Sequence, residues 1–292
     1  MSKIAMIGVG AMGEPMATNL LKKGLAVTVL KSRRNEVTER LKALGAAITA
    51  TPAEAATGCE VVVLSLPTSR EVESALFGDG GAAAKLPAGA LVIDCTTGNP
   101  PDTERIAAKL RERKIGFAAA GMTRGVAGAK QGKLAFFIGG DKPDVEKAKA
   151  VLQATGDTFI EFATAAQAHA AKLISNVLSY AAVALVNEAL MLGAKSGVDL
   201  PTLYRALSEG APSKALEAFG SRIVAREYDP PRVTVDHACD DLVLAGQLAA
   251  SGGTSLSMLA AAHDIYRRSS KGGSGERDVS IRGEFWRAGG KA

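Results

Sequence analysis

Hydrophobic positions follow two different periods along the first half of the chain. Short apolar runs that end in turn residues predict buried strands, and apolar residues that recur every three or four positions predict helices between them. The predicted strands cover 3–8, 25–30, 60–67, 90–97, 115–121 and 134–140. Helices are expected near 11–23, 52–57, 71–77, 100–114 and 142–156. This alternation predicts an α/β fold with a doubly wound, mostly parallel sheet, whose binding sites lie at the carboxyl ends of the strands.

The pattern changes after about Phe162. An alanine-rich run from about Ala165 has no Pro or Gly before Gly193, so we expect one helix of roughly 30 residues, far longer than usual. Its apolar residues lie nearly all round the helix, which predicts burial on most sides. Further helical segments follow, and the Gly- and Ser-rich segment 269–283 predicts a loop. We therefore expect an N-terminal α/β domain at 1–162 and an all-α domain at 163–292, joined by the long helix.

Three glycines separate the first predicted strand from the first predicted helix. Gly8, Gly10 and Gly13 form Gly-x-Gly-x-x-Gly, the pattern of a dinucleotide-binding Rossmann turn. The first glycine permits the tight turn, the second lets a pyrophosphate approach, and the third lets the helix pack closely on the strand. The helix N-terminus then faces the phosphates with free N–H groups. The alternative interpretation is a glycine turn without a ligand.

The end of the second predicted strand indicates which dinucleotide binds. An NAD site usually places an acidic residue there to hold the ribose 2′-hydroxyl. This chain has Lys31, Ser32, Arg33 and Arg34, with no acid before Glu36. Cationic side chains favour a 2′-phosphate, so NADP(H) is preferred and NAD(H) stays possible. The alternative is an ordinary basic loop.

Composition and charge narrow the classes of partner. The net charge of +5 comes from scattered basic residues. Such a distribution favours small anionic partners over nucleic acid. The alternative is an ordinary solvated surface that has no partner. Cys59, Cys95 and Cys239 lie far apart, so we expect no metal site and no disulfide framework. We therefore expect a cytoplasmic protein, because the cytoplasm is a reducing compartment. We also expect no membrane partner, because no hydrophobic run approaches the ~20 residues of a membrane span, and no signal peptide, because the first strand begins almost at the N-terminus.

Four segments together resemble the β-hydroxyacid dehydrogenase family, which includes 3-hydroxyisobutyrate dehydrogenase and tartronate semialdehyde reductase. They are IGVGAMGEPMATNLLKKG, IDCTTGNPPDT, GMTRGVAGAKQGKLAFFIGG and HAAKLISN. The resemblance covers nearly the whole chain. It implies reversible hydride transfer between a nicotinamide and a small 3-hydroxy acid or its semialdehyde. It also implies a homodimer or homotetramer, and the long apolar helix independently calls for a partner subunit.

The resemblance assigns catalysis to two residues of the long helix. Its catalytic lysine falls on Lys172, and its asparagine falls on Asn176, which shares a helix face with the lysine. A lysine ammonium can give a proton to the carbonyl oxygen and remove it in the reverse direction. His169 lies on the same face, either as a substrate contact or as a packing residue.

The resemblance also implies the residues that bind cofactor and substrate. The expected cofactor-binding residues are Gly8, Gly10, Ala11, Met12, Gly13, Lys31, Ser32, Arg33, Leu66, Pro67 and Thr97. The expected substrate-binding residues are Thr96, Thr123, Arg124 and Gly125. Arg124 stands where the family usually has glycine, and its guanidinium predicts a compact anionic substrate. Alternatively it turns to solvent or pairs with an acid such as Asp94.

Departures from the family pattern leave other functions open. Asp240 replaces a lysine that usually approaches the cofactor, and the sequence offers no account of that change. Within the same chemistry, a sulfolactaldehyde-type reductase is the main alternative. An imine reductase of the same architecture, which lacks the lysine, and a non-catalytic nucleotide-binding sensor are the others.

Overall fold

The computed structural model describes residues 3–281, which fold as two compact units. The first unit ends at Lys172 and the second begins at Leu173, so the division falls inside the long helix α8 (Ala165–Lys195). The sequence analysis placed the boundary at 162/163, just before this helix. Because the first two turns of α8 pack on the first unit, Lys172 belongs with the α/β unit.

The first unit is built on one eight-stranded sheet with the order β3-β2-β1-β4-β5-β6-β7-β8. The pairs are parallel except for β6 and β7, which run antiparallel, so the predicted mostly parallel sheet is confirmed. The strands are β1 (Lys3–Ile7), β2 (Ala26–Leu30), β3 (Ala47–Thr49), β4 (Val61–Leu64), β5 (Leu91–Asp94), β6 (Gly116–Thr123), β7 (Leu134–Gly140) and β8 (Gly156–Phe162). The sequence pattern missed the two edge strands, β3 and β8, because β3 is short and β8 is half-exposed.

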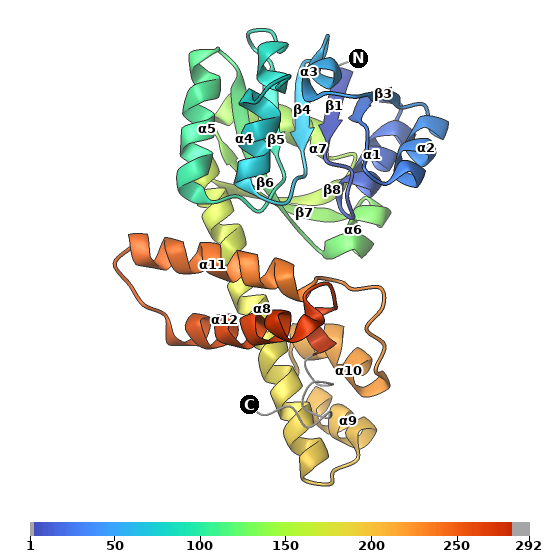
Figure 1. The fold of residues 1–292 in the computed structure, drawn as a ribbon, viewed down its shortest axis with the longest axis vertical. Helices are drawn as coiled ribbons and strands as arrows, with labels where there is room; N and C mark the ends of the chain where they lie inside the picture. The colour runs from blue at the N-terminus through green and yellow to red at the C-terminus, as the bar shows by residue number, and fades with distance from the viewer. Residues whose placement is uncertain (1–2, 282–292) are drawn as a thin grey trace. The chain divides into compact units, whose positions relative to one another are not determined.

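Helices cover both faces of this sheet (Figure 1). They are α1 (Gly13–Lys22), α2 (Asn35–Ala43), α3 (Pro52–Ala56), α4 (Ser69–Phe77), α5 (Pro100–Glu112), α6 (Gly125–Gln131) and α7 (Lys142–Leu152), with a short turn η1 (Ala82–Ala84). Successive residues of a strand point to opposite faces. Accordingly, Ile4 and Met6 of β1 join one apolar cluster, and Ala5 and Ile7 join the other. Burial on both faces explains why the strands read as unbroken apolar runs.

The second unit is helical as far as Ile281. Its elements after α8 are α9 (Leu200–Gly210), η2 (Leu216–Gly220), α10 (Ser221–Ala225), α11 (Val235–Ser251), α12 (Ser257–Ser269), η3 (Ser270–Ser274) and η4 (Val279–Ile281). Segment 269–283 was predicted to be a loop, which was wrong for η3 and η4 but right for residues 275–278 between them. Asp278 is fully buried and accepts hydrogen bonds from Arg232 N and Ser280 N at 2.7 and 2.9 Å. These bonds hold the segment against the helices.

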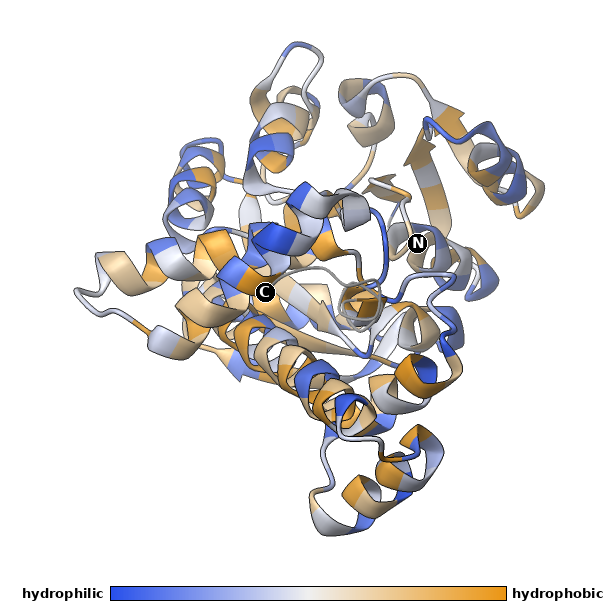
Figure 2. Cartoon of the chain, turned by 60° about the horizontal axis from the view of Figure 1, so that its bottom comes forward, coloured by the Kyte–Doolittle hydropathy of each residue, from blue (hydrophilic) through white to orange (hydrophobic). Residues whose placement is uncertain are grey.

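Helix α8 is a single helix of 31 residues, as predicted, and within the single chain one apolar side of it is left uncovered. Ile174, Leu178, Leu185 and Leu192 form a stripe and are 62–74% exposed. Figure 2 shows hydrophobic residues recurring along the helices of the chain. Contrary to the expectation from sequence, α8 is long and apolar enough to cross a membrane, although only 28% of its most apolar window is buried. One such helix is weak evidence for a membrane span, because the test considers length and composition only.

Candidate active site

The three glycines form a tight turn between β1 and α1. At Gly8, φ is +94° and an added Cβ would lie under 3.0 Å from the Ser65 carbonyl oxygen. A Cβ on Gly13 would come equally close to the carbonyl oxygen of Gly8. Gly10 differs, because a Cβ there would meet nothing within 4 Å. No side chain caps the first turn of α1. This cradle fits a pyrophosphate.

The other expected cofactor residues lie at the same edge of the sheet. Leu66 and Pro67 follow β4, and Thr97 follows β5. Because β1, β4 and β5 are parallel neighbours, their carboxyl ends meet at one edge, and β1 and β4 flank the point where the strand order reverses. Thr123 ends β6, the next parallel strand along this edge. The first unit therefore brings these residues together.

Thr96 is buried between two of these loops. Its hydroxyl accepts a hydrogen bond from Leu66 N at 3.2 Å, and its own N–H donates to the Asp94 carboxylate at 3.0 Å. Burial raises the pKa of Asp94, and the hydrogen bonds from Thr96 oppose this rise. Thr96 thus ties the loop after β5 to the loop after β4. Its role in binding substrate stays a prediction.

Two exposed cationic side chains, Lys31 and Arg33, follow the end of β2. Lys31 and Arg33 are exposed and make no ion pair within the described part of the chain. Arg34 is 4.0 Å from the Glu14 carboxylate. Ser32 Oγ accepts a hydrogen bond from Arg34 N at 3.1 Å, which shapes the turn into α2. Binding of a 2′-phosphate by Lys31 and Arg33 stays a prediction.

Lys172 lies against bare backbone at the carboxyl half of β6. A Cβ on Gly121 would lie 2.9 Å from Lys172 Cβ and 3.0 Å from its Cγ. Gly121 thus makes room for the stem of the lysine, two residues before Thr123. The position matches the edge of the sheet where the cofactor residues gather, which supports the assignment of Lys172.

Asn176 is held by a buried carboxylate that the sequence analysis did not single out. Its Nδ2 donates to Asp241 Oδ2 at 2.7 Å, and the Tyr180 hydroxyl donates to the same oxygen at 2.8 Å. Asp241 is 3% exposed, so these bonds replace its hydration. Its neighbour Asp240, at the family's lysine position, is exposed. The only signal in the sequence was that Asp241 follows Asp240 in a motif similar to the family's.

The guanidinium of Arg124 is hydrogen-bonded to other residues of the first unit. Its φ of +74° is in the left-handed region. Its guanidinium donates to Asp157 at 2.6 Å, to Thr158 Oγ1 at 2.9 Å and to the carbonyl oxygen of Lys133 at 2.9 Å. The hydrogen bonds from Thr158 and Arg124 lower the pKa of Asp157. The pairing with an acid is thus present, with Asp157 as the partner in place of Asp94. Substrate binding by Arg124, Thr123 and Gly125 stays a prediction.

His169 is fully buried at the start of α8. Its Nδ1 is 2.7 Å from Thr103 Oγ1 on α5. Burial lowers the pKa of the imidazole. With no exposed surface, the side chain acts as a packing and hydrogen-bonding residue, which was the alternative to a substrate contact. Thr103 gave no functional signal in the sequence.

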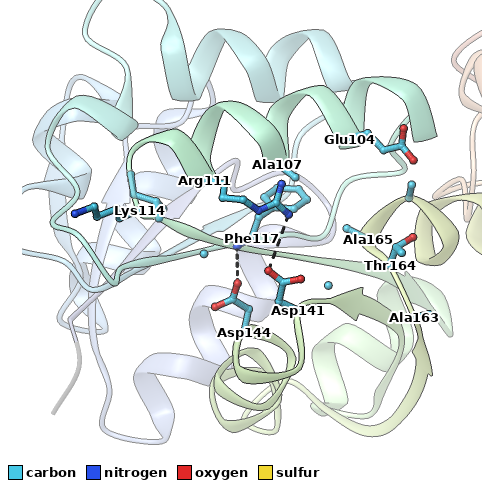
Figure 3. Close-up of a pocket in the computed structure, with 14 residues that line it drawn as sticks. Glu104, Ala107, Arg111, Lys114, Phe117, Asp141, Asp144, Ala163, Thr164 and Ala165 are labelled. Carbon is cyan, nitrogen blue, oxygen red and sulfur yellow. Dashed lines mark hydrogen bonds and ion pairs between the residues drawn. The ribbon is translucent and has the colours of Figure 1, made fainter.

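A cavity of about 390 Å³ lies away from this edge. Figure 3 shows it between α5 and the ends of β7 and β8, with Arg111 near Asp141 and Asp144 accepting from Phe117 N. Gly116, at the amino end of β6, also lines it. The cavity is therefore at the opposite end of β6 from Thr123 and is not part of the candidate active site. Among residues 3–281, no cluster of three or more His, Cys, Asp or Glu side chains could hold a metal ion.

Comparisons with known proteins match nearly the whole chain. The family model for the NAD binding domain of 6-phosphogluconate dehydrogenase matches residues 3–169, and the one for NAD-binding of NADP-dependent 3-hydroxyisobutyrate dehydrogenase matches 166–282. The chain is 32% identical to the NAD-dependent L-serine dehydrogenase of Pseudomonas aeruginosa, over 96% of each chain. It is 30% identical to the 3-sulfolactaldehyde reductase of Escherichia coli, over 96% of this chain and 94% of the relative. The crystal structure of 3-hydroxyisobutyrate dehydrogenase from Salmonella typhimurium superposes with a TM-score of 0.88 at 25% identity, over 98% of this chain and all of that one.

Proposed function

The chain belongs to the β-hydroxyacid dehydrogenase family, and on that premise we propose that it transfers a hydride between NADP(H) and a small, anionic 3-hydroxy acid or its semialdehyde. One observation carries the proposal. Lys172 is seated on Gly121 of β6, in the same unit as the glycine turn and at the edge of the sheet where the cofactor-binding loops end.

Different residues of the chain have different roles in such a reaction. A bound nicotinamide supplies or accepts the hydride at the reacting carbon. Lys172 gives a proton to the carbonyl oxygen in reduction and removes it from the hydroxyl in oxidation. Asn176, whose amide is oriented by Asp241, helps to hold that oxygen. Thr123 and Arg124 bind the acid group.

The experiment that tests this function is a substrate panel. Oxidation of NADPH is followed by absorbance with semialdehydes of three to five carbons, with sulfonate analogues and with cyclic imines. We expect turnover of a short carboxylate or sulfonate aldehyde. Turnover of imines alone would contradict the proposal, as would tight cofactor binding without turnover of any substrate, which would support a nucleotide sensor.

The L-serine dehydrogenase named above is NAD-dependent. A preference of this chain for NADP(H) would therefore depend on residues such as Lys31 and Arg33. A charge-assisted hydrogen bond contributes about 1.5–3 kcal/mol, so we expect kcat/KM to be at least about tenfold higher with NADPH than with NADH. Arg33→Ala should remove most of this difference by impairing NADPH alone. Lys42→Ala, an exposed cation at the end of α2, is the matched control. Equal efficiency with both cofactors in the wild-type protein would contradict the preference.

Arg124 is expected to bind the acid group of the substrate and so to favour anionic substrates over neutral ones. Arg124→Gly suits the local φ of +74°, since glycine adopts this region without strain. We expect this variant to raise KM for an anionic aldehyde several-fold more than for a neutral aldehyde of equal size. Asp157→Asn, which weakens the competing partner and keeps the guanidinium, should not raise KM for the anion. An equal loss with both aldehydes would show that Arg124 does not recognise charge.

We propose that the exposed stripe of α8 packs against a second copy of the chain. Exposed apolar residues that gather on one face mark an interaction surface, and the family resemblance points to a homodimer or homotetramer. Light scattering at micromolar concentration should therefore give at least a dimer. Leu178→Glu with Leu185→Glu should shift the protein toward monomers, whereas Leu44→Glu, at an exposed leucine of the first unit, should not. A monomeric wild-type protein would refute this assembly.

A further inference from the structure

His169 occupies a closed site made by three elements of the first unit. Thr103 is on α5, Gly98 is in the loop after β5, and Asp94 ends β5. A Cβ on Gly98 would lie under 3.0 Å from the imidazole Nδ1, so the ring lies directly against the backbone of this loop. The loop also carries Thr96 and Thr97, which are among the predicted site residues.

The hydrogen bonds around the imidazole indicate its protonation. The Thr103 hydroxyl donates its single proton to the carbonyl oxygen of Asn99 at 3.0 Å. We infer that the imidazole donates the 2.7 Å bond between His169 Nδ1 and Thr103 Oγ1, because the other tautomer would place a proton on the unpartnered Nε2. The other ring nitrogen, Nε2, has no hydrogen-bond partner among the described residues. Burial favours the neutral ring and lowers the pKa of His169, whereas Asp94, which faces the ring from β5, acts in the opposite direction with a smaller effect.

The imidazole and Lys172 belong to the same helix. The two residues are three positions apart on α8, so they lie on the same side of the helix in successive turns. The imidazole rests on Gly98, and the stem of Lys172 rests on Gly121. Two side chains of one helix are thus each seated on a bare stretch of backbone beside the cofactor edge of the sheet.

We propose that His169 is a positioning residue, which fixes the first turns of α8 against the loop between β5 and α5 and thereby sets the position of Lys172 relative to Thr96 and Thr97. The contact that does this is the Nδ1–Thr103 hydrogen bond together with the fit of the ring against Gly98. The inference rests on the proposed function, since a fixed position matters only if Lys172 takes part in the reaction.

The first test requires no activity. In protein labelled with ¹⁵N-histidine, the three histidines are separated by comparison with the His169→Asn variant. We expect His169 to be neutral and protonated at Nδ1 from pH 6 to pH 8. A ring protonated at Nε2, or one that titrates in this range, would overturn the assignment of the hydrogen bond.

The second test separates positioning from packing. Asparagine can place an amide nitrogen near the position of Nδ1, whereas glutamine places it near Nε2. A displacement of about 1 Å at a catalytic group can cost about 10²-fold in rate. We therefore expect His169→Gln and Thr103→Val to lower kcat about 10- to 100-fold while KM for NADPH changes less than twofold. His169→Asn and Thr103→Ser should recover much of kcat.

Two results would overturn the proposal. One is a kcat within twofold of wild type for Thr103→Val and His169→Gln. The other is a loss of kcat in His169→Asn equal to that in His169→Gln. Failure of the proposed function has a different signature, because the wild-type protein would then turn over no substrate, or Lys172 variants would keep full activity.

The fit of the ring against Gly98 gives a separate steric test. Gly98→Ala adds a methyl group that must displace the imidazole, so we expect it to lower kcat as the histidine variants do. Removing the ring vacates the space that the methyl group needs. The double variant Gly98→Ala/His169→Ala should therefore be no less active than His169→Ala alone. If the two losses multiply, the ring and Gly98 act independently and the proposal fails.

Discussion

Replacing Lys172 by methionine is expected to lower kcat by about 10²–10⁴-fold, the usual contribution of general acid–base catalysis. Methionine keeps an unbranched stem that can pack on Gly121, so the fold and the glycine turn should be unaffected. The dissociation constant for NADPH, measured by fluorescence titration, should change little. The loss should appear in both kcat and kcat/KM, because the proton transfer occurs only in the transition state.

Lys195→Met is the matched control for this prediction. Lys195 ends the same helix, far from the candidate site in sequence, and is exposed. Its replacement should leave kcat within twofold of wild type. A near-normal kcat for Lys172→Met would remove Lys172 from the mechanism.

Two glycine-to-alanine variants of the turn are expected to affect different properties. Gly13→Ala should lower thermal stability, and Gly10→Ala should weaken cofactor binding. A Cβ on Gly13 would collide with the carbonyl oxygen of Gly8, which cannot move without shifting α1 from the sheet. Overpacking of this kind costs about 1–3 kcal/mol, so Gly13→Ala should lower Tm by several degrees. A Cβ on Gly10 meets nothing within 4 Å, so Gly10→Ala should leave Tm nearly unchanged.

Gly10→Ala should nevertheless weaken cofactor binding at least about tenfold, because the methyl group occupies the space through which a pyrophosphate approaches the backbone. Thermal unfolding and NADPH titration of both variants check the pair. An unchanged affinity in Gly10→Ala would mean that the open side of the turn does not face the cofactor.

Local patterns were sufficient where each element is determined by its own residues. The glycine turn, the central strands and the length of α8 could all be predicted, because periodicity, turn chemistry and the absence of Pro and Gly act within a few residues. The helices departed from the prediction at α2 and α6, which the pattern missed, at η3 and η4, and in the exposed stripe of α8. Leu178 and Leu185 read as core residues in the sequence, but no part of the described chain covers them.

The sequence by itself determined the class of fold, the dinucleotide turn and, through the resemblance, the helix that carries Lys172 and Asn176. Only the tertiary structure decided which side chains share a hydrogen bond: Asn176 with Asp241, Arg124 with Asp157, and His169 with Thr103. The partners in these pairs are 65, 33 and 66 residues apart. No periodic pattern reports a contact over such a separation, because it depends on how complete elements pack, and packing is set by apolar surfaces that carry no information about their polar neighbours.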